Sequence, residues 1–272
     1  MNKNIDEIEF TIFDTETTGL ESGSGDRVVE IAGVRLKGRE RIAAFQTLVN
    51  PHRPVSPAAF EVNKISSDML VGAPEAAEAI PGFLDFARDS CLCSYNAAFD
   101  LGFLNSELKL IGKNLGDNHV VDILKMAKRL MPGLERYSLR FVASALGIKA
   151  EQKHRAFSDV ELTIDVFHAL NGKLRDKGIS DFINFLSLFG LNSRFLDDIN
   201  NQKLARIQEA IDLGVRLKIK YLSGIDALVT EREVIPKEIK QDRGANYLIG
   251  FCCLRNQERT FRIDGILHFE IV

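Results

Sequence analysis

The sequence predicts an α/β domain with a mixed sheet, followed by a small all-β domain. Three strand patterns open the chain, and helical and strand patterns then alternate, which is the order expected of a sheet with helices packed on it. After a helix at residues 203–213, only strand patterns separated by turns remain. With 272 residues and 45% hydrophobic side chains, the chain can form one large domain or two modest ones.

The first domain is expected to begin with three strands, at residues 10–17, 27–36 and 41–49. A hairpin near residues 37–39 joins the last two. Residues 75–88 look helical apart from Pro81 and Gly82, and a short buried strand follows at residues 91–95. Helices are expected at residues 97–111, 139–146 and 157–170. Residues 119–131 are expected to pass from a strand into a further helix.

We place the domain boundary near residue 200, with residues 1–172 as the first domain and residues 173–200 as a helical connector. The second domain, residues 201–272, reads as four strand patterns separated by turns. Short strands of this kind are typical of a small barrel or sandwich. The patterns lie at residues 216–224, 228–235, 246–254 and 259–272.

Composition restricts the possible classes of protein. No stretch approaches the roughly 18 apolar residues of a membrane span, and the N-terminus does not resemble a signal peptide, so we expect a cytoplasmic protein with no membrane partner. The net charge of −3 does not mark a nucleic-acid binder. Residues 201–272 hold 12 Lys and Arg against 10 Asp and Glu, whereas residues 1–200 hold 23 against 28.

Asp14 and Glu16 are the most informative pair, because they end the apolar strand FTIFDTET. Side chains alternate along a strand, so both carboxylates point to the same side. Like charges so close are unfavourable unless a cation lies between them. Carboxylate oxygens favour Mg²⁺ or Mn²⁺. The pair therefore indicates a metal-dependent reaction on a phosphate, although most Asp-x-Glu triplets are solvated strand ends.

Two more acids and a histidine extend this set. Asp100 opens a helix in the run SYNAAFDLGFL, and Asp159 lies near a helix start with His154 five residues before it. An acid at a helix start also has a simpler explanation, since it interacts favourably with the helix dipole.

Together the runs DTETTG, YNAAFD and HRAFSD, with VDILKMAKRL between the last two, resemble the DEDDh family of 3′→5′ exonucleases, above all the epsilon proofreading subunit of DNA polymerase III and its relatives. The resemblance covers roughly residues 8–170 and extends to TLVNP, VNKIS and RYSLRFVASALGI. It implies a ribonuclease H-like fold. It also implies that two Mg²⁺ or Mn²⁺ ions are bound by Asp14, Glu16, Asp100 and Asp159, with His154 as general base.

The same resemblance implies a substrate site beside the metals. Thr17, Thr18 and Leu20 would approach the terminal nucleotide, or simply form a tight turn. Tyr95 departs from the family, which commonly has His-Asn-Ala where this chain has Tyr95-Asn96-Ala97; this places substrate preference in question. Arg155 is either a phosphate contact or a solvated arginine.

Residues 203–272 resemble a WYL domain through LARIQEAIDLGVRLKIKY, TEREVIP, ANYLIGFCCLRNQERTFRID and GILHFEI. The naming triplet departs here, because Asn246 replaces Trp before Tyr247 and Leu248. Such domains look like small SH3- or Sm-like barrels associated with nucleic-acid or nucleotide-like ligands. Arginine forks and aromatic faces suit a single strand; the alternative is ordinary strand and core residues. The candidates are Tyr221, Arg232, Tyr247, Arg255, Arg259 and Arg262.

The sequence thus predicts a two-metal 3′→5′ exonuclease acting on single-stranded ends, with DNA as the first choice and nucleoside monophosphates as products. Two alternatives remain: an RNA or short-oligonucleotide exonuclease, and a nucleic-acid-responsive regulator with minor nuclease activity. We expect a stand-alone repair or defence nuclease, since no polymerase-binding tail is evident. Polymerase association and oligomeric state are left open.

Overall fold

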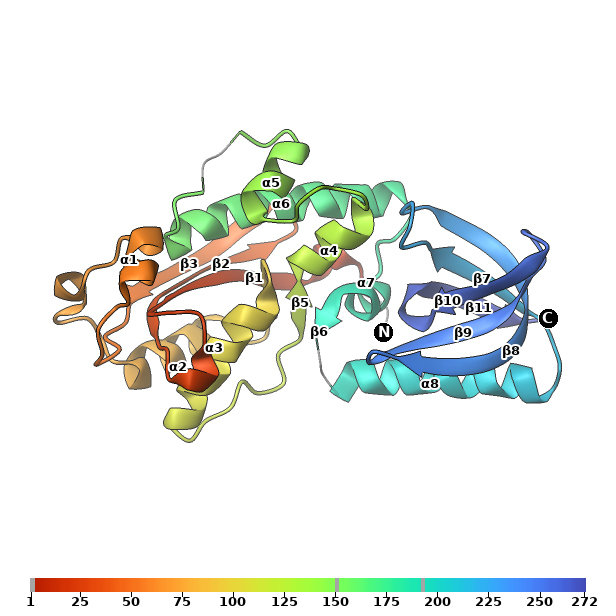
Figure 1. The fold of residues 1–272 in the computed structure, drawn as a ribbon, viewed down its shortest axis with the longest axis horizontal. Coiled ribbons are helices and arrows are strands. Elements are labelled where there is room, and N and C mark those ends of the chain that lie inside the picture. Colours follow the sequence, from red (N-terminus) through yellow and green to blue (C-terminus); the bar gives the residue numbers. More distant parts are fainter. Residues whose placement is uncertain (1–2, 150–151, 192–193) are drawn as a thin grey trace.

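The computed structural model describes residues 3–149, 152–191 and 194–272. It contains two sheets, each with its own helices, placed side by side along the long axis of the molecule (Figure 1). Among the described residues, no helix combines the length and the apolar character that crossing a membrane requires.

The first sheet has six strands in the order β3-β2-β1-β4-β5-β6. The pairs β1–β4 and β4–β5 are parallel and the other pairs are antiparallel, so the predicted mixed sheet is confirmed. The strands are β1 (Glu9–Thr17), β2 (Val28–Lys37), β3 (Glu40–Leu48), β4 (Cys91–Ser94), β5 (Val120–Asp122) and β6 (Gly190–Leu191).

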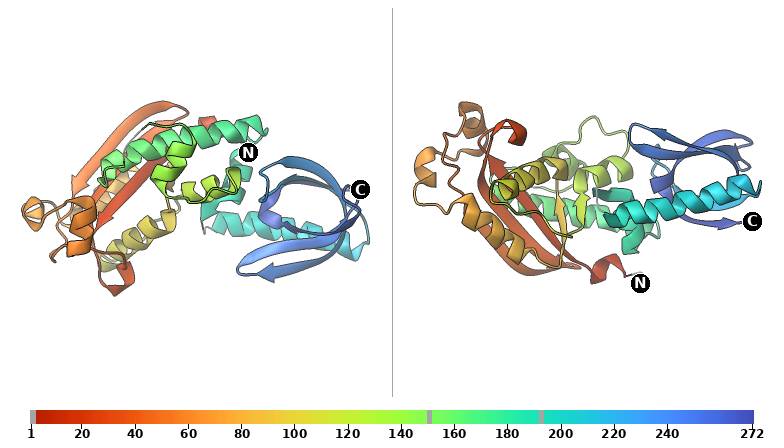
Figure 2. Two further views of the ribbon diagram at one scale, coloured as in Figure 1. Left: turned by 45° about the horizontal axis from the view of Figure 1, so that its top comes forward. Right: turned by 90° about the horizontal axis from the view of Figure 1, so that it is seen from below.

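Helices cover both faces of this sheet (Figure 2). Phe10 and Ile12 of β1 point into a core formed with α4, α5, α6 and α7, while Phe13 points into a second core formed with α2 and α3. The helices are α1 (Pro57–Asn63), α2 (Ala76–Phe86), α3 (Ala97–Leu110), α4 (Ile123–Leu130), α5 (Leu139–Ala145), α6 (Ala156–Asp176) and α7 (Phe182–Phe189).

Alternation along β1 decides where the acidic pair lies. Asp14 and Glu16 have the same parity as Phe10 and Ile12, so they continue the face that α6 covers. The α6 helix contains Asp159 in its first turn. The fold therefore brings residues more than 140 positions apart to one end of β1.

Two elements differ from the expected local structure. Helix α2 continues through Pro81, although a proline inside a helix removes one backbone hydrogen bond. Residues 172 and 200 both lie inside helices, α6 and α8 (Arg194–Asp212). Between them, α7 packs into the same core as Phe10 through Phe185 and Phe189, and β6 pairs with β5.

The second sheet has five antiparallel strands in the order β10-β9-β8-β7-β11. It curves strongly around its own core, and α8 contributes Ile207 and Ala210 to that core (Figure 2). Among the described residues, no ladder joins the edge strands β10 and β11. The strands are β7 (Leu217–Leu222), β8 (Val229–Asp242), β9 (Ala245–Cys252), β10 (Gln257–Arg262) and β11 (Ile266–Ile271).

Short 3-10 helices complete the fold: η1 (Ile5–Glu7), η2 (Ser22–Ser24), η3 (Ser67–Leu70) and η4 (Ile263–Gly265). The last of these interrupts the segment 259–272, which the sequence pattern presented as one strand. It turns the chain from β10 to β11, at opposite edges of the second sheet.

Candidate active site

Three carboxylates converge at the end of β1. Asp14, Glu16 and Asp159 each offer an oxygen within 4.8 Å of those of the other two. They line a cavity of about 550 Å³ together with Asp100 and His154. The five residues that the sequence placed in one catalytic set therefore lie around one cavity.

Asp100 reaches this cavity from α3, on the other face of the sheet. Its Oδ1 accepts hydrogen bonds from the backbone N of Thr15 at 3.0 Å and from Thr15 Oγ1 at 2.7 Å, and its Oδ2 accepts from Ser94 Oγ. These bonds explain why Asp100 lies outside the tight group of three. They also hold α3 against the end of β1.

Burial raises the pKa of every carboxyl group in the set, and repulsion from neighbouring carboxylates adds to the rise for Asp14 and Glu16. The pKa of Asp14 lies well above its usual value because of burial first, then Asp100 and Glu16. Burial and the charge of Asp159 raise the pKa of Glu16 to about 8. Burial raises the pKa of Asp100 to about 6, although hydrogen bonds from Ser94 and Thr15 oppose the rise. Burial also raises that of Asp159.

This donor set fits divalent cations. Clustered carboxylate oxygens are the ligands that Mg²⁺ and Mn²⁺ prefer, and a bound cation offsets the repulsion that contributes to the raised pKa values of Asp14 and Glu16. Asp14, Glu16 and Asp159 are the residues that would hold such an ion, and Asp100 is adjacent.

His154 lies at the cavity rim immediately before α6. Its side chain is 47% exposed, and Nδ1 lies 3.9 Å from Asp159 Oδ2. Its backbone has a φ of 50°, a left-handed conformation that is uncommon for a histidine. The next residue, Arg155, is held away from the cavity: its Nε and Nη2 donate to Glu30 at 3.0 and 2.9 Å. Arg155 was expected to be either a phosphate contact or a solvated arginine; in the structure it is instead the ion-pair partner of the buried Glu30.

The residues expected near a terminal nucleotide separate into two groups. Thr17, Leu20 and Tyr95 line the cavity, and Leu20 is 81% exposed. Thr18 and Asn96 do not line it. Thr18 is buried and its Oγ1 donates to Asp26 Oδ1 at 3.0 Å.

The start of α3 is fixed by a further residue, Asp122. Its Oδ1 accepts from the backbone N of Asn96 at 3.2 Å and from that of Leu124 at 2.9 Å. Tyr95 instead fixes a loop, because its hydroxyl donates to the Tyr137 carbonyl at 2.7 Å.

Sequence reasoning missed two residues of this site. Asn63 of α1 lines the cavity, and its hydrogen bond with Glu16 opposes the rise in the pKa of Glu16. Glu30 of β2 is fully buried and lies directly opposite Glu16 in the β1–β2 ladder. A signal was present for Glu30, since a charged residue interrupts the apolar strand RVVEIAGV.

The candidates in the second unit lie in different surroundings. Arg232 is buried: its Nε donates to Thr230 Oγ1 at 2.9 Å and its guanidinium lies over the Phe261 ring. Arg262 and Tyr247 are paired across β9 and β10. The Tyr221 hydroxyl accepts from the Arg262 backbone N at 3.4 Å. The structure thus brings together Tyr221, Tyr247 and Arg262.

The remaining two arginines lie elsewhere on the hairpin. Arg255 is exposed in the turn before β10, and Arg259 is paired with Gly250, near the turn end of the same two strands.

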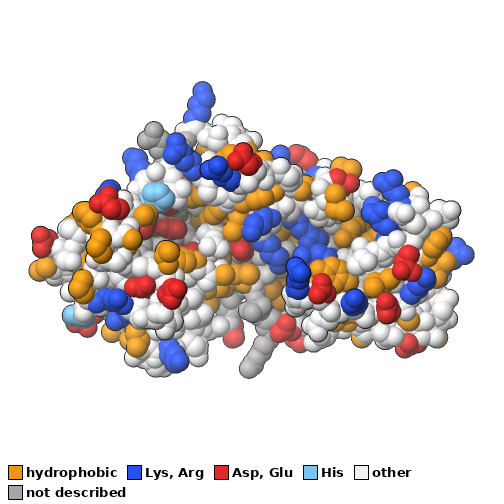
Figure 3. Space-filling model, viewed as in Figure 1, with side chains coloured by type: hydrophobic (Ala, Val, Ile, Leu, Met, Phe, Trp, Pro, Cys, Tyr) orange, Lys and Arg blue, Asp and Glu red, His pale blue; other side chains and the backbone are white. Residues whose placement is uncertain are grey.

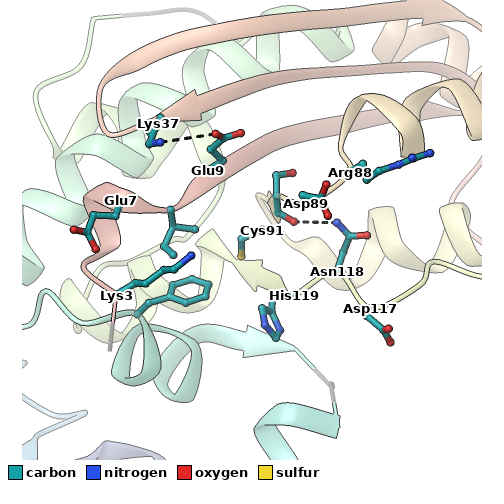
Figure 4. A pocket seen from close by; sticks show the side chains of 13 residues that line it. Lys3, Glu7, Glu9, Lys37, Arg88, Asp89, Cys91, Asp117, Asn118 and His119 are labelled. Atoms are coloured by element: carbon teal, nitrogen blue, oxygen red, sulfur yellow. Dashed lines mark hydrogen bonds and ion pairs between the residues drawn. The ribbon is translucent and has the colours of Figure 1, made fainter. Parts of the chain in front are cut away.

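A second cavity, of about 590 Å³, lies at the opposite end of β1, around Glu9 (Figure 4). It is larger than the acidic cavity, but its charges are mixed and partly paired. Glu9 Oε1 lies 4.0 Å from Lys37 Nζ, and Asn118 Nδ2 donates to the Ser90 carbonyl at 2.9 Å. No group of carboxylates converges there among the described residues, so the acidic cavity is the candidate active site.

Comparisons with known proteins match two separate segments of the chain. A family model described as Exonuclease matches residues 11–167, and one described as WYL domain matches residues 202–271. DNA polymerase III PolC-type of Clostridium perfringens is 32% identical over 262 residues; the match covers 94% of this chain and 18% of that protein. The chain thus spans about a fifth of the length of that relative.

Two solved structures share the fold. Exonuclease X in complex with 5′-overhanging duplex DNA is 26% identical, with a TM-score of 0.51 over 62% of this chain and 93% of that one. The zinc-bound complex of E. coli exonuclease I with single-stranded DNA is 16% identical, with a TM-score of 0.59 over 90% of this chain and 55% of that one.

Proposed function

The chain belongs to the exonuclease family of metal-dependent phosphodiesterases and carries a C-terminal WYL domain, and we propose that it removes nucleotides one at a time from the 3′ ends of single-stranded DNA. The observation that carries this proposal is the convergence of Asp14, Glu16 and Asp159 beside His154. Single-stranded DNA is proposed because one protein of similar fold binds it.

The metals and the acidic residues have complementary roles in this reaction. Two Mg²⁺ or Mn²⁺ ions would supply an activated water and charge stabilisation for the leaving 3′ oxygen. Asp14, Glu16 and Asp159 would hold them, with Asp100 as the fourth ligand. In their absence the carboxylates repel one another, which contributes to the raised pKa values of Asp14 and Glu16.

His154 is proposed as the general base that takes a proton from the attacking water. A histidine suits this role because its ordinary pKa of about 6.5 lies near neutral pH. Its exposed ring at the rim can reach a group in the cavity, and Asp159 is near enough to orient it.

The terminal nucleotide would lie over the apolar side of the cavity. Leu20, Val62 and Phe99 line this side, and apolar contacts favour a base without reading its sequence. Thr17 would add polar contacts at the sugar. Tyr95 is proposed to shape the cavity wall through its bond with Tyr137, rather than to contact the scissile phosphate.

We further propose residues 1–172 as the catalytic unit and residues 201–272 as a barrel-like unit that binds or senses nucleic acid. Residues 173–200, with α7 and β6, would connect and support the two. The strong curvature of the second sheet supports a barrel-like form, in which Tyr221, Tyr247 and Arg262 are the proposed contacts.

A time course with end-labelled strands tests the proposal. In Mg²⁺, a 5′-labelled single strand should shorten in steps of one nucleotide, and a 3′-labelled strand should release its label as a mononucleotide from the start. Shortening from the 5′ end, or cuts within the strand, would overturn the polarity. Matched RNA and duplex substrates, run in parallel, decide between the DNA and RNA alternatives.

A further inference from the structure

One carboxylate at the junction of the two units is shared by several cations. Asp264 of η4 accepts a hydrogen bond from Arg129 Nη1 of α4 at 3.1 Å and two from Arg262, Nη2 at 2.6 Å and Nε at 3.2 Å. Lys125, one turn before Arg129 on α4, acts electrostatically on the same group. Three cations therefore surround a single acid.

The pKa values of Asp264 and Lys125 show how the charges of this cluster act on one another. Although burial would raise the pKa of Asp264, the charges of Arg129, Arg262 and Lys125 hold that pKa below its ordinary value. Burial is the main cause that lowers the pKa of Lys125; attraction to Asp264 and Asp122 opposes this change, and repulsion from Arg262 and Arg129 adds to it. Three cations, Lys125, Arg129 and Arg262, thus stand against two acids, Asp264 and Asp122, which leaves one net positive charge.

Joining the two units does not account for this excess. A single ion pair between Arg129 and Asp264 would be enough to link α4 to η4. Surface ion pairs elsewhere in the second unit, Arg216–Glu233 and Lys237–Glu258, join one cation to one acid. Additional cations that repel one another weaken such a link. Arg129 is only 8% exposed; its Nη2 donates to the Leu222 carbonyl at 3.4 Å, and its Nε has no hydrogen-bond partner among the described residues.

The backbone is shaped to admit Arg129. A methyl group at Gly265 would overlap Arg129 Nη2 and the Tyr221 ring, so the residue after Asp264 must be glycine for the guanidinium to reach this position. Arg262 is 43% exposed at its side chain, and Tyr247 lies opposite it on β9. Arginine and tyrosine side chains placed together form a surface suited to phosphates and unstacked bases.

The junction faces the same way as the acidic recess. Figure 3 shows Lys and Arg side chains gathered where the two units meet, and acidic side chains in a hollow of the first unit on the same face. Helix α4 lies between the end of the first sheet and the second sheet (Figure 1). A chain with its end in the acidic cavity can therefore continue over this face to the junction.

We propose that Lys125 and Arg262, with the buried Arg129 behind them, form a second binding site, which holds phosphates of the single strand several nucleotides 5′ of the bond that is cleaved. This inference rests on the proposed function and adds a consequence to it. A strand long enough to reach both places is bound by both, whereas a very short oligonucleotide is bound by the acidic cavity alone. The enzyme should therefore favour longer strands.

The test compares Lys125→Gln, Arg262→Gln and the double variant with a matched control, Arg216→Gln with Lys237→Gln. The control residues are cations of the second unit that each pair with one acid, Glu233 and Glu258. The probes are single-stranded oligodeoxythymidylates of about 4 and about 16 nucleotides, which bracket the site sizes of small single-strand-binding folds. Binding is measured in Ca²⁺ or EDTA over a range of salt concentrations, and hydrolysis in Mg²⁺.

For the double variant we expect the KM of the long strand to rise on the order of tenfold, with kcat on the short strand unchanged. The slope of log affinity against log salt should flatten by about 0.7 for each lost phosphate contact. The control should retain the native slope and KM.

Equal KM values for the long strand in the double variant and the control would overturn the proposal. An equal loss on both strand lengths would also overturn it, since the cluster would then act through the fold. If the native protein hydrolyses neither strand, the proposed function is wrong. The binding measurement then still shows whether Lys125 and Arg262 bind the long strand. Thermal unfolding checks that each variant is folded. The single variant Lys125→Gln leaves the three hydrogen bonds to Asp264 in place, so it tests the site even if the double variant does not fold.

Discussion

Arg155, the residue next to His154, forms a bidentate ion pair with Glu30. Arg155 Nε and Nη2 donate to the two oxygens of Glu30 at 3.0 and 2.9 Å, and the Ala156 backbone N adds a bond at 3.1 Å. Glu30 is fully buried beside Glu16 in the sheet. The pair therefore ties the start of α6, and with it His154 and Asp159, to strand β2.

The variant Glu30→Gln should destabilise the protein and slow catalysis. The glutamine amide offers the Arg155 guanidinium one neutral acceptor in place of two charged ones, at a cost of about 2 kcal/mol in the free energy of unfolding. Denaturant unfolding measures that cost. The turnover number should fall while KM for a short strand changes little, because Glu30 does not line the cavity. Native turnover in a destabilised variant would show that Glu30 serves stability alone.

His154→Gln should reduce kcat by about 10² to 10⁴ and leave metal affinity nearly native. The reason is that the histidine lies at the rim, 3.9 Å from Asp159, outside the group of three carboxylates. Isothermal titration with Mn²⁺ in the absence of substrate separates the two effects. A loss of Mn²⁺ affinity that parallels the loss of kcat would make His154 a ligand instead of a base.

Without metal, the stability of the protein should fall as the pH rises from about 4.5 to about 8. Over this window Glu16 is protonated in the folded state, with a pKa of about 8, and already ionised in the unfolded state, whose ordinary value is 4.5. The unfolded state then binds fewer protons, so the free energy of unfolding decreases with pH.

Denaturant unfolding in EDTA at several pH values measures this slope. Glu16→Gln should have a shallower slope, and Mg²⁺ should restore native stability at pH 8 because it offsets the repulsion. A slope that is the same with and without Glu16 would contradict the electrostatic explanation.

Tyr95→Phe should cost about 1 kcal/mol of stability by removing the hydrogen bond to the Tyr137 carbonyl, with kcat close to native. Tyr95→His introduces the residue common in the family at this position and should shift the ratio of kcat/KM values for DNA and RNA strands. A large loss of kcat in Tyr95→Phe would instead indicate that the hydroxyl group contacts the substrate.

The sequence predicted the parts of the site that depend on local pattern or family motif. The apolar run before Asp14 and the alternation of β1 placed Asp14 and Glu16 on one side, and the motifs around Asp100 and Asp159 supplied the other acids. Glu30 was missed because its role comes from the β1–β2 ladder, which pairs it with Glu16. Such pairing depends on tertiary structure and leaves little trace in a local pattern.

The cluster of Lys125, Arg129 and Arg262 around Asp264 could not be predicted from the sequence for a similar reason. Arg262 was identified as a candidate, but Lys125, Arg129 and Asp264 lie in segments that the sequence presented as an ordinary helix and a continuous strand. Only the 3-10 turn at η4, with glycine at position 265, brings Asp264 against α4. Likewise, the bonds of Thr18 to Asp26 and of Arg155 to Glu30 depend on neighbours that are distant in sequence or folded back by a turn.

The most direct test of the central claim is the Mg²⁺-dependent release of labelled mononucleotides from a 3′-labelled single strand by Asp14→Asn, compared with Asp117→Asn. Asp14 belongs to the converging carboxylates, whereas Asp117 is an exposed acid in the loop before β5. We predict that Asp14→Asn lowers the rate to below about a hundredth of native while Asp117→Asn retains it. Native activity in folded Asp14→Asn would contradict the assignment of the active site.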